Sequence, residues 1–107
     1  MSKPRSRITH ELKTYPEFFE QTRNGRKKFE LRRNDRDFKV GDELLLREWE
    51  PPEPGKVYFD GDFHYNGREL LVRVDYIMTA KDAVGFDPNG DWPILADFVI
   101  MSISLVH

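Results

Sequence analysis

Basic residues gather in one short stretch of the chain, residues 23–36, at a density suited to binding an anionic partner. The stretch carries seven basic and two acidic side chains: Arg23, Arg26, Lys27, Lys28, Arg32, Arg33 and Arg36, with Glu30 and Asp35. The rest of the chain is acidic, since the whole protein has 17 basic and 19 acidic residues. A basic segment in an acidic protein predicts contact with phosphate groups, as in RNA or a nucleotide.

A plainer interpretation of the same stretch is a solvated strand face. Its charges would then pair with the acidic segment 48–62, and such surface ion pairs contribute roughly 0–1 kcal/mol each. That acidic segment could instead contact a protein partner, an interpretation that rests on composition alone. The charge pattern by itself leaves these interpretations open.

Glu30 and its neighbours could add selectivity to a basic site. Glu30 could act as a base or accept a hydrogen bond from a nucleobase amino group, although an ion pair that keeps the arginines extended is favoured. Asn34 and Asp35 could face a ligand or could satisfy backbone amides in a turn. Trp49 could stack on a base for about 1–3 kcal/mol, or it could pack at the rim of the core.

Composition removes several classes of site. With no cysteine in 107 residues, disulfides, thiolate zinc sites and thiol nucleophiles are excluded. The histidines, His10, His64 and His107, are too scattered to suggest a metal site, and no cofactor is predicted. No apolar run approaches the roughly 18 residues that cross a bilayer, and the N-terminus has no signal-peptide pattern. The sequence predicts a cytoplasmic protein without a membrane partner, either monomeric or weakly dimeric.

The elements that must position these residues are mostly strands. The predicted strands are residues 7–13, 28–32, 42–50, 69–79 and 92–106. The predicted helix begins after Thr14, which forms a capping box with Glu17, and it ends at Gly25. Residues 80–91 are predicted to be irregular.

The sequence also predicts which face of strand 28–32 points to the core and how two pairs of strands are connected. In strand 28–32, Phe29 and Leu31 are expected to face the core, while the charged residues between them point the other way. Residues 51–64 form a loop, with or without a short edge strand at 57–59, and Asn66-Gly67 predicts a tight hairpin. The expected fold class is α+β, mainly β: one domain over residues 7–107, after a flexible segment 1–6, built as a small pseudo-barrel of five to six strands with one early helix.

Several short motifs resemble the ASCH domain family of the PUA-like superfamily of small β-barrels, in particular a branch found in bacteria and their phages. The motifs are His10-Glu11-Leu12-Lys13, Gly25-x-Lys27-x-Phe29-Glu30-Leu31-Arg32, Asn34-Asp35-Arg36-x-Phe38-x-x-Gly41-Asp42 and Tyr65-x-Gly67-Arg68. The resemblance implies a pseudo-barrel whose first helix flanks a cleft, where relatives bind RNA or modified nucleosides. It also favours a site role for Lys13.

The residues and the resemblance together predict an RNA- or nucleotide-binding domain with a basic cleft. The predicted ligand-binding residues are Lys13, Lys27, Lys28, Glu30, Arg32, Arg33, Asn34, Asp35, Arg36 and Trp49.

The resemblance also implies an alternative, a small amidohydrolase that acts on an acylated nucleoside. One ASCH branch removes an acetyl group from acetylated cytidine with a lysine, a threonine and a glutamate. Lys27 falls on the lysine position, but Glu30 replaces the threonine. The glutamate would fall near Arg73, with Asp75 two residues later as its substitute. Without the hydroxyl nucleophile, only Lys27 and Glu30 remain as catalytic candidates, acting as a general-base pair. A binding domain is therefore favoured over an enzyme.

Overall fold

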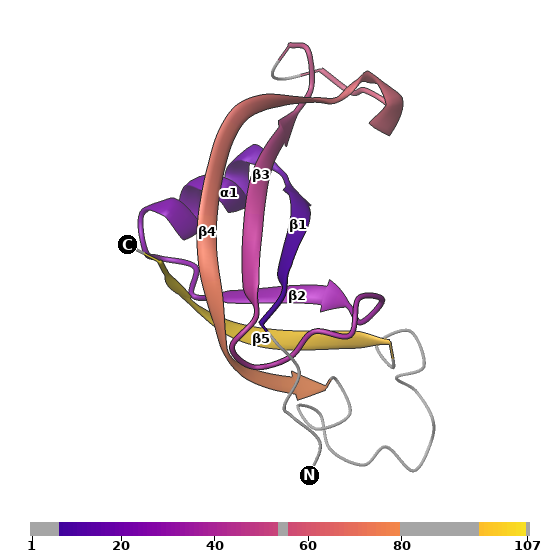
Figure 1. Ribbon diagram of the computed structural model, residues 1–107. Helices are drawn as coiled ribbons and strands as arrows, with labels where there is room; N and C mark the ends of the chain where they lie inside the picture. Colours follow the sequence, from indigo (N-terminus) through magenta and orange to yellow (C-terminus); the bar gives the residue numbers. More distant parts are fainter. Residues whose placement is uncertain (1–6, 54–55, 80–96, 107) are drawn as a thin grey trace, which may run out of the picture.

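Five strands form one sheet that curves into a half-barrel, and one short helix packs beside it (Figure 1). The computed structural model describes residues 7–53, 56–79 and 97–106. The elements are β1 (Thr9–Thr14), α1 (Pro16–Arg23), β2 (Phe29–Arg33), β3 (Glu43–Glu50), a 3-10 turn (Asp60–Asp62), β4 (His64–Thr79) and β5 (Phe98–Leu105). The predicted fold class, mainly β with five to six strands and one early helix, is confirmed.

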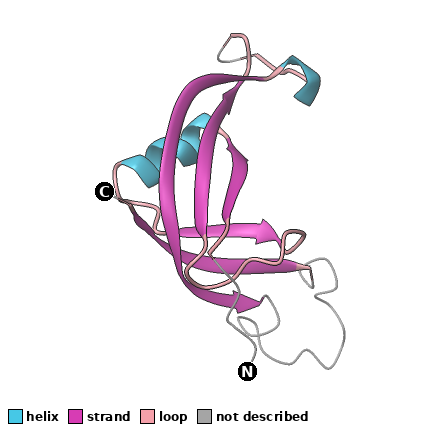
Figure 2. Ribbon diagram, in the orientation of Figure 1, coloured by secondary structure: helices cyan, strands magenta, loops and turns pink. Residues whose placement is uncertain are grey.

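The sheet order is β1-β3-β4-β5-β2, so β1 and β2 are its two edges. The pair β1–β3 is parallel, and the other three pairs are antiparallel. Figure 2 shows the long β4 arching through the sheet, so that β2 and β5 cross β1 and β3 at a steep angle. This curvature brings the two edges toward each other without backbone pairing between them.

Two arginines from the basic stretch bridge the open edges. Arg32 Nη1 donates to the carbonyl oxygen of Lys13 at 3.0 Å, and Arg36 Nη1 donates to that of Glu11 at 2.7 Å. Carbonyls two residues apart in a strand point the same way, here toward the edge of β1 that no strand covers. Guanidinium groups thus satisfy backbone acceptors that a complete barrel would satisfy with another strand.

The register of β2 overturns the predicted facing of this strand. Glu30 lies opposite Met101 of β5, and directly opposed residues share a face of the sheet. Because Met101 is completely buried, Glu30 also points into the half-barrel and is buried. Phe29 and Leu31, expected in the core, are about half exposed instead. The apolar core comes from the other strands and from Phe38 in the β2–β3 connection: Leu12, Phe38, Leu44, Leu46, Val72, Val74, Val99, Met101 and Ile103.

The helix begins where it was predicted to begin, but the predicted capping box is wrong. Tyr15 is the N-terminal cap residue and makes no side-chain cap hydrogen bond, while Pro16 occupies the first turn. Thr14 instead ends β1 with its hydroxyl buried, where it accepts a hydrogen bond from Arg32 Nη2 at 3.2 Å. Gly25 has a φ of 82°, the left-handed conformation predicted after the helix end.

For the β3–β4 connection, one prediction is wrong and one open alternative is decided. Asn66-Gly67 does not turn the chain but forms a bulge within β4. Arg47 and Trp49 of β3 pair with Glu69 and Tyr65 of β4. One residue separates the two partners in β3, whereas three residues separate them in β4. The optional strand at 57–59 is a loop with an exposed Val57 and Phe59. The predictions for 80–91 and for the start of the last strand at 92–96 lie outside the described residues, whereas 98–105 is confirmed as a strand.

Arg68 fastens α1 to the sheet. Its guanidinium lies 5.0 Å from the ring centroid of Phe19, the fully buried residue of the helix, and it bonds Glu20 of α1 at 3.3 Å and the buried Glu48 of β3 at 3.2 Å. Asn66 also donates to Glu48, at 2.6 Å. The helix is therefore held by a charged network as well as by apolar packing. Within the described ranges, no helix has the length and apolar character to cross a membrane.

Glu20 predicts an acid-sensitive contribution to stability, because its carboxylate pairs with Arg23 of the same helix as well as with Arg68. Hydrogen bonds from Arg23 and then from Arg68 lower the pKa of Glu20 from its ordinary 4.5 to about 2. The stabilisation is thus fully present above pH 4.5 and is lost as the pH falls toward 2. Urea unfolding from pH 6 to pH 2 should show the stability difference between the wild type and Glu20→Gln shrinking over this window. Because Glu20 is exposed, 1 M salt should reduce that difference; a difference independent of pH would contradict the assignment.

Candidate functional site

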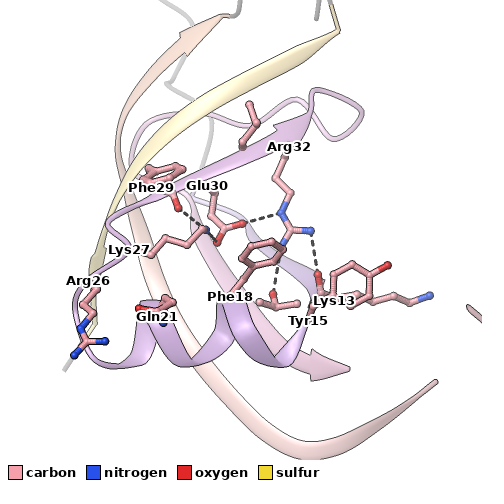
Figure 3. Close-up of a pocket in the computed structure, with 11 residues that line it drawn as sticks. Lys13, Tyr15, Phe18, Gln21, Arg26, Lys27, Phe29, Glu30 and Arg32 are labelled. Atoms are coloured by element: carbon pink, nitrogen blue, oxygen red, sulfur yellow. Dashed lines mark hydrogen bonds and ion pairs between the residues drawn. The ribbon is translucent and has the colours of Figure 1, made fainter. Parts of the chain in front are cut away.

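A cleft of about 660 Å³ opens between α1, the end of β1 and the edge strand β2 (Figure 3). Its lining residues are Lys13, Thr14, Tyr15, Phe18, Gln21, Arg26, Lys27, Phe29, Glu30, Leu31 and Arg32. The lining thus combines aromatic and basic side chains with a single carboxylate.

The floor of the cleft is an ion cluster around Glu30. One carboxylate oxygen accepts from Lys27 Nζ and the other from Arg32 Nε, both at 2.8 Å. The side chains of Glu30, Lys27 and Arg32 are 3%, 15% and 25% exposed. All three guanidinium nitrogens of Arg32 are engaged, because Nη1 and Nη2 bond to β1. Lys27 Nζ also donates to the carbonyl oxygen of Phe29 at 2.6 Å. Glu30 therefore sets the positions of two cations and joins them to the bridge between the sheet edges.

Aromatic rings form the walls. Tyr15, Phe18 and Phe29 are 42%, 44% and 49% exposed, large fractions for residues of this size around one cavity. The ring centroids of Phe18 and Phe29 lie 5.9 and 5.0 Å from Lys27 Nζ, one from the helix and one from the strand. A planar ligand that enters the cleft would meet ring surface from both elements.

Two exposed cations stand at the rim. Figure 3 shows Lys13 and Arg26 extending outward at opposite ends of the cleft, with α1 running between them. Over the described part of the chain, neither side chain has an ion-pair partner. Lys13 Nζ lies 4.5 Å from the ring centroid of Trp49, which packs with Tyr15 and Phe63 just outside the cleft.

The structure brings together some of the predicted site residues and separates the others. Those that line the cleft are Lys13, Lys27, Glu30 and Arg32, and Trp49 adjoins it through Lys13. Those outside it are Lys28, Arg33, Asn34, Asp35 and Arg36. Lys28 lines a smaller cavity under the end of α1, and Arg36 is bound to β1. The backbone amide of Asn34 donates to the carbonyl oxygen of Asp97 at 2.6 Å, which extends the antiparallel pairing of β2 with β5 by one position.

Sequence reasoning missed the aromatic walls. Of the adjacent Phe18 and Phe19, which the sequence does not mark as site residues, only Phe19 is buried, because adjacent helical residues point about 100° apart and α1 has the sheet on one side only. Phe29 was missed because its strand was assigned the opposite face. The signal available in the sequence was the adjacency of two phenylalanines on a short helix, since their side chains must point about 100° apart.

The positions implied by the hydrolase branch do not converge. Arg73 and Asp75 are exposed residues of β4, whereas the neighbouring Val72 and Val74 face the core. Neither lines the cleft with Lys27 and Glu30. Among the described residues, no group of three His, Cys, Asp or Glu side chains is arranged to hold a metal ion.

A family model and a phage protein match this chain, and the description of neither names an activity. The family model described as a domain of unknown function (DUF3850) matches residues 9–103. An uncharacterized 12.9 kDa protein in the GpA 3′ region of Escherichia phage P2 is 40% identical over 40 residues. That alignment covers 37% of this chain and 37% of the length of the phage protein.

Proposed function

The chain belongs to the DUF3850 family, which supplies no activity, and from the cleft itself we infer that the protein binds single-stranded RNA or a similar nucleotide ligand. The observation that carries this inference is the set of half-exposed rings in a cleft whose rim bears Lys13 and Arg26, two cations without an ion-pair partner among the described residues. Rings of this kind stack on bases, at about 1–3 kcal/mol per base in single-strand binders. Rim lysine and arginine side chains supply phosphate contacts.

The buried state of Glu30 refines this proposal. With 3% of its side chain exposed and both oxygens already bonded, Glu30 acts mainly as an anchor for Lys27 and Arg32. Base recognition is then assigned to the walls and phosphate contact to the rim. A nucleic-acid partner would suit a cytoplasmic location and kinship with the ASCH domains, both of which stay predictions.

Fluorescence anisotropy with a labelled single-stranded RNA hexamer tests the proposal. The wild type should bind at 50 mM salt, and binding should weaken as salt rises, because counterions are released from the phosphates. Gln21→Trp should fill the cleft and weaken binding at least about tenfold, which corresponds to about 1.4 kcal/mol.

Val40→Trp is the matched control, because it adds the same indole to an exposed turn residue outside the cleft. It should bind as the wild type does. Absence of binding at low salt, or equal binding by the wild type and Gln21→Trp, would refute the proposed site.

A second candidate function rests on the contact between Lys27 Nζ and Glu30 at the cleft floor. This pair could take a proton from water as the water adds to the amide carbonyl of an acylated nucleoside. The C–N bond would break, and the proton would pass to the departing amine. Incubation with N4-acetylcytidine should then release acetate and cytidine, with turnover lost in Lys27→Ala and kept in Lys28→Ala. No release by the wild type would eliminate this candidate.

A further inference from the structure

We propose that the cleft takes a single strand of several nucleotides that runs along α1, with separate phosphates at Lys13 and Arg26 and bases against the rings between them. This inference rests on the proposed function and adds the class of ligand, an oligonucleotide in place of a free nucleotide. Its basis is the order of side chains along the cleft: cation, aromatic walls, cation (Figure 3).

The distance between the two cations sets the length of the ligand. Lys13 lies three residues before Pro16, the first residue of α1, and Arg26 lies three residues after Arg23, the last. The helix between them has 8 residues and rises about 12 Å. A stacked strand advances about 3.4 Å per nucleotide. The two cations therefore meet phosphates of different nucleotides, and a single nucleotide reaches only one of them.

The unpaired charge lies at the two ends of the cleft, and the aromatic middle carries little of it. At the floor, Lys27 and Arg32 already share the carboxylate of Glu30, so the middle of the cleft offers apolar ring surface and little unpaired charge. This suits uncharged bases. Lys13 and Arg26 are exposed, and no carboxylate of the described residues pairs with either, so they remain available to phosphates.

Isothermal titration calorimetry with uridine 5′-monophosphate and with uridine oligonucleotides of two, three, four and six residues tests the length of the site. Affinity should rise steeply up to about three or four nucleotides, the number that spans the helix, and should then level off. Equal affinity for the monophosphate and the hexamer would overturn this inference while leaving the proposed function standing. Failure of every member to bind would overturn both.

Charge reversal tests the two ends separately. Lys13→Glu and Arg26→Glu should each weaken hexamer binding about tenfold or more, and each should reduce the steepness of the salt dependence by about one phosphate contact. Lys28→Glu and Arg33→Glu are matched controls from the same basic stretch, exposed but outside the cleft, and should have much smaller effects. All four side chains lie at the surface, so Tm should change little.

Two outcomes of these titrations would reject the inference. One is an effect at only one end of the cleft, and the other is an equal effect of all four variants. A tetraglutamate peptide that binds as tightly as the tetranucleotide would also reject it, since the cleft would then recognise negative charge without bases.

Discussion

Replacing Glu30 with alanine is expected to lower the free energy of unfolding by about 3 kcal/mol. The change leaves Lys27 and Arg32, 15% and 25% exposed, close together without their shared counter-charge. Removal of one partner from a buried ion pair typically costs about 3–5 kcal/mol, and the partial exposure of the two cations favours the lower end. Equilibrium urea unfolding measures the difference.

The loss should be local as well as global. Arg32 also bonds to Lys13 and Thr14 of β1, so its displacement should weaken the bridge between the sheet edges, and amide exchange in β2 should accelerate. Asp75→Ala is the control, because it removes an exposed carboxylate on the outer face of β4 and should change stability by no more than about 0.5 kcal/mol. If Glu30→Ala is as stable as this control, the ion cluster is not a structural anchor.

The elements of this fold were largely predictable because most strands alternate regularly. β1 and β3 were predicted as strands close to their observed bounds, and in both of them buried residues recur at every second position, Glu48 of β3 included. The bulge at Asn66-Gly67 was misread as a hairpin because the local preference of Asn-Gly for a positive φ is met equally by a bulge, where Gly67 has a φ of 92°. Only the pairing with β3 distinguishes the two.

The candidate site was less predictable, because its geometry depends on register. The alternation of Phe29, Glu30 and Leu31 allows either side of the strand to face the core. Hydrophobicity favours the side of Phe29 and Leu31, which is the wrong one. The pairing with β5 decides, by placing Glu30 opposite a buried methionine. Partners for Glu30 then come from two directions along the chain, Lys27 before the strand and Arg32 near its end, so the buried charge is compensated. Such compensation is a tertiary property that a single strand does not reveal.

The basic stretch therefore divides into structural and available charges. Arg32 and Arg36 bridge the sheet edges, Lys27 holds Glu30, and Arg23 pairs with Glu20 of the same helix. Charge density alone would have assigned all of these to a ligand. What distinguishes Arg26 within the stretch is a position at the cleft rim without an ion-pair partner in the described residues.

Replacement of a phenylalanine of the cleft walls is expected to cause the largest loss of the proposed RNA binding. Phe18→Ala and Phe29→Ala should each weaken binding of a single-stranded hexamer by about 1–3 kcal/mol if each ring stacks on a base. That range corresponds to about 5- to 150-fold in Kd. Both rings are about half exposed, so the proposed loss in binding should exceed the loss in stability. Fluorescence anisotropy and urea unfolding of the same samples separate the two effects.

Two further variants identify the physical origin of the loss. Phe18→Leu keeps apolar bulk but removes the ring. If stacking dominates, this variant should bind RNA nearly as poorly as Phe18→Ala. If only apolar contact matters, it should bind nearly as well as the wild type. Tyr76→Ala removes an exposed ring from β4, outside the cleft, and should leave binding unchanged. Binding that survives the loss of both phenylalanines would mean that phosphate contacts alone hold the RNA, and the cleft would then lose its role in recognising bases.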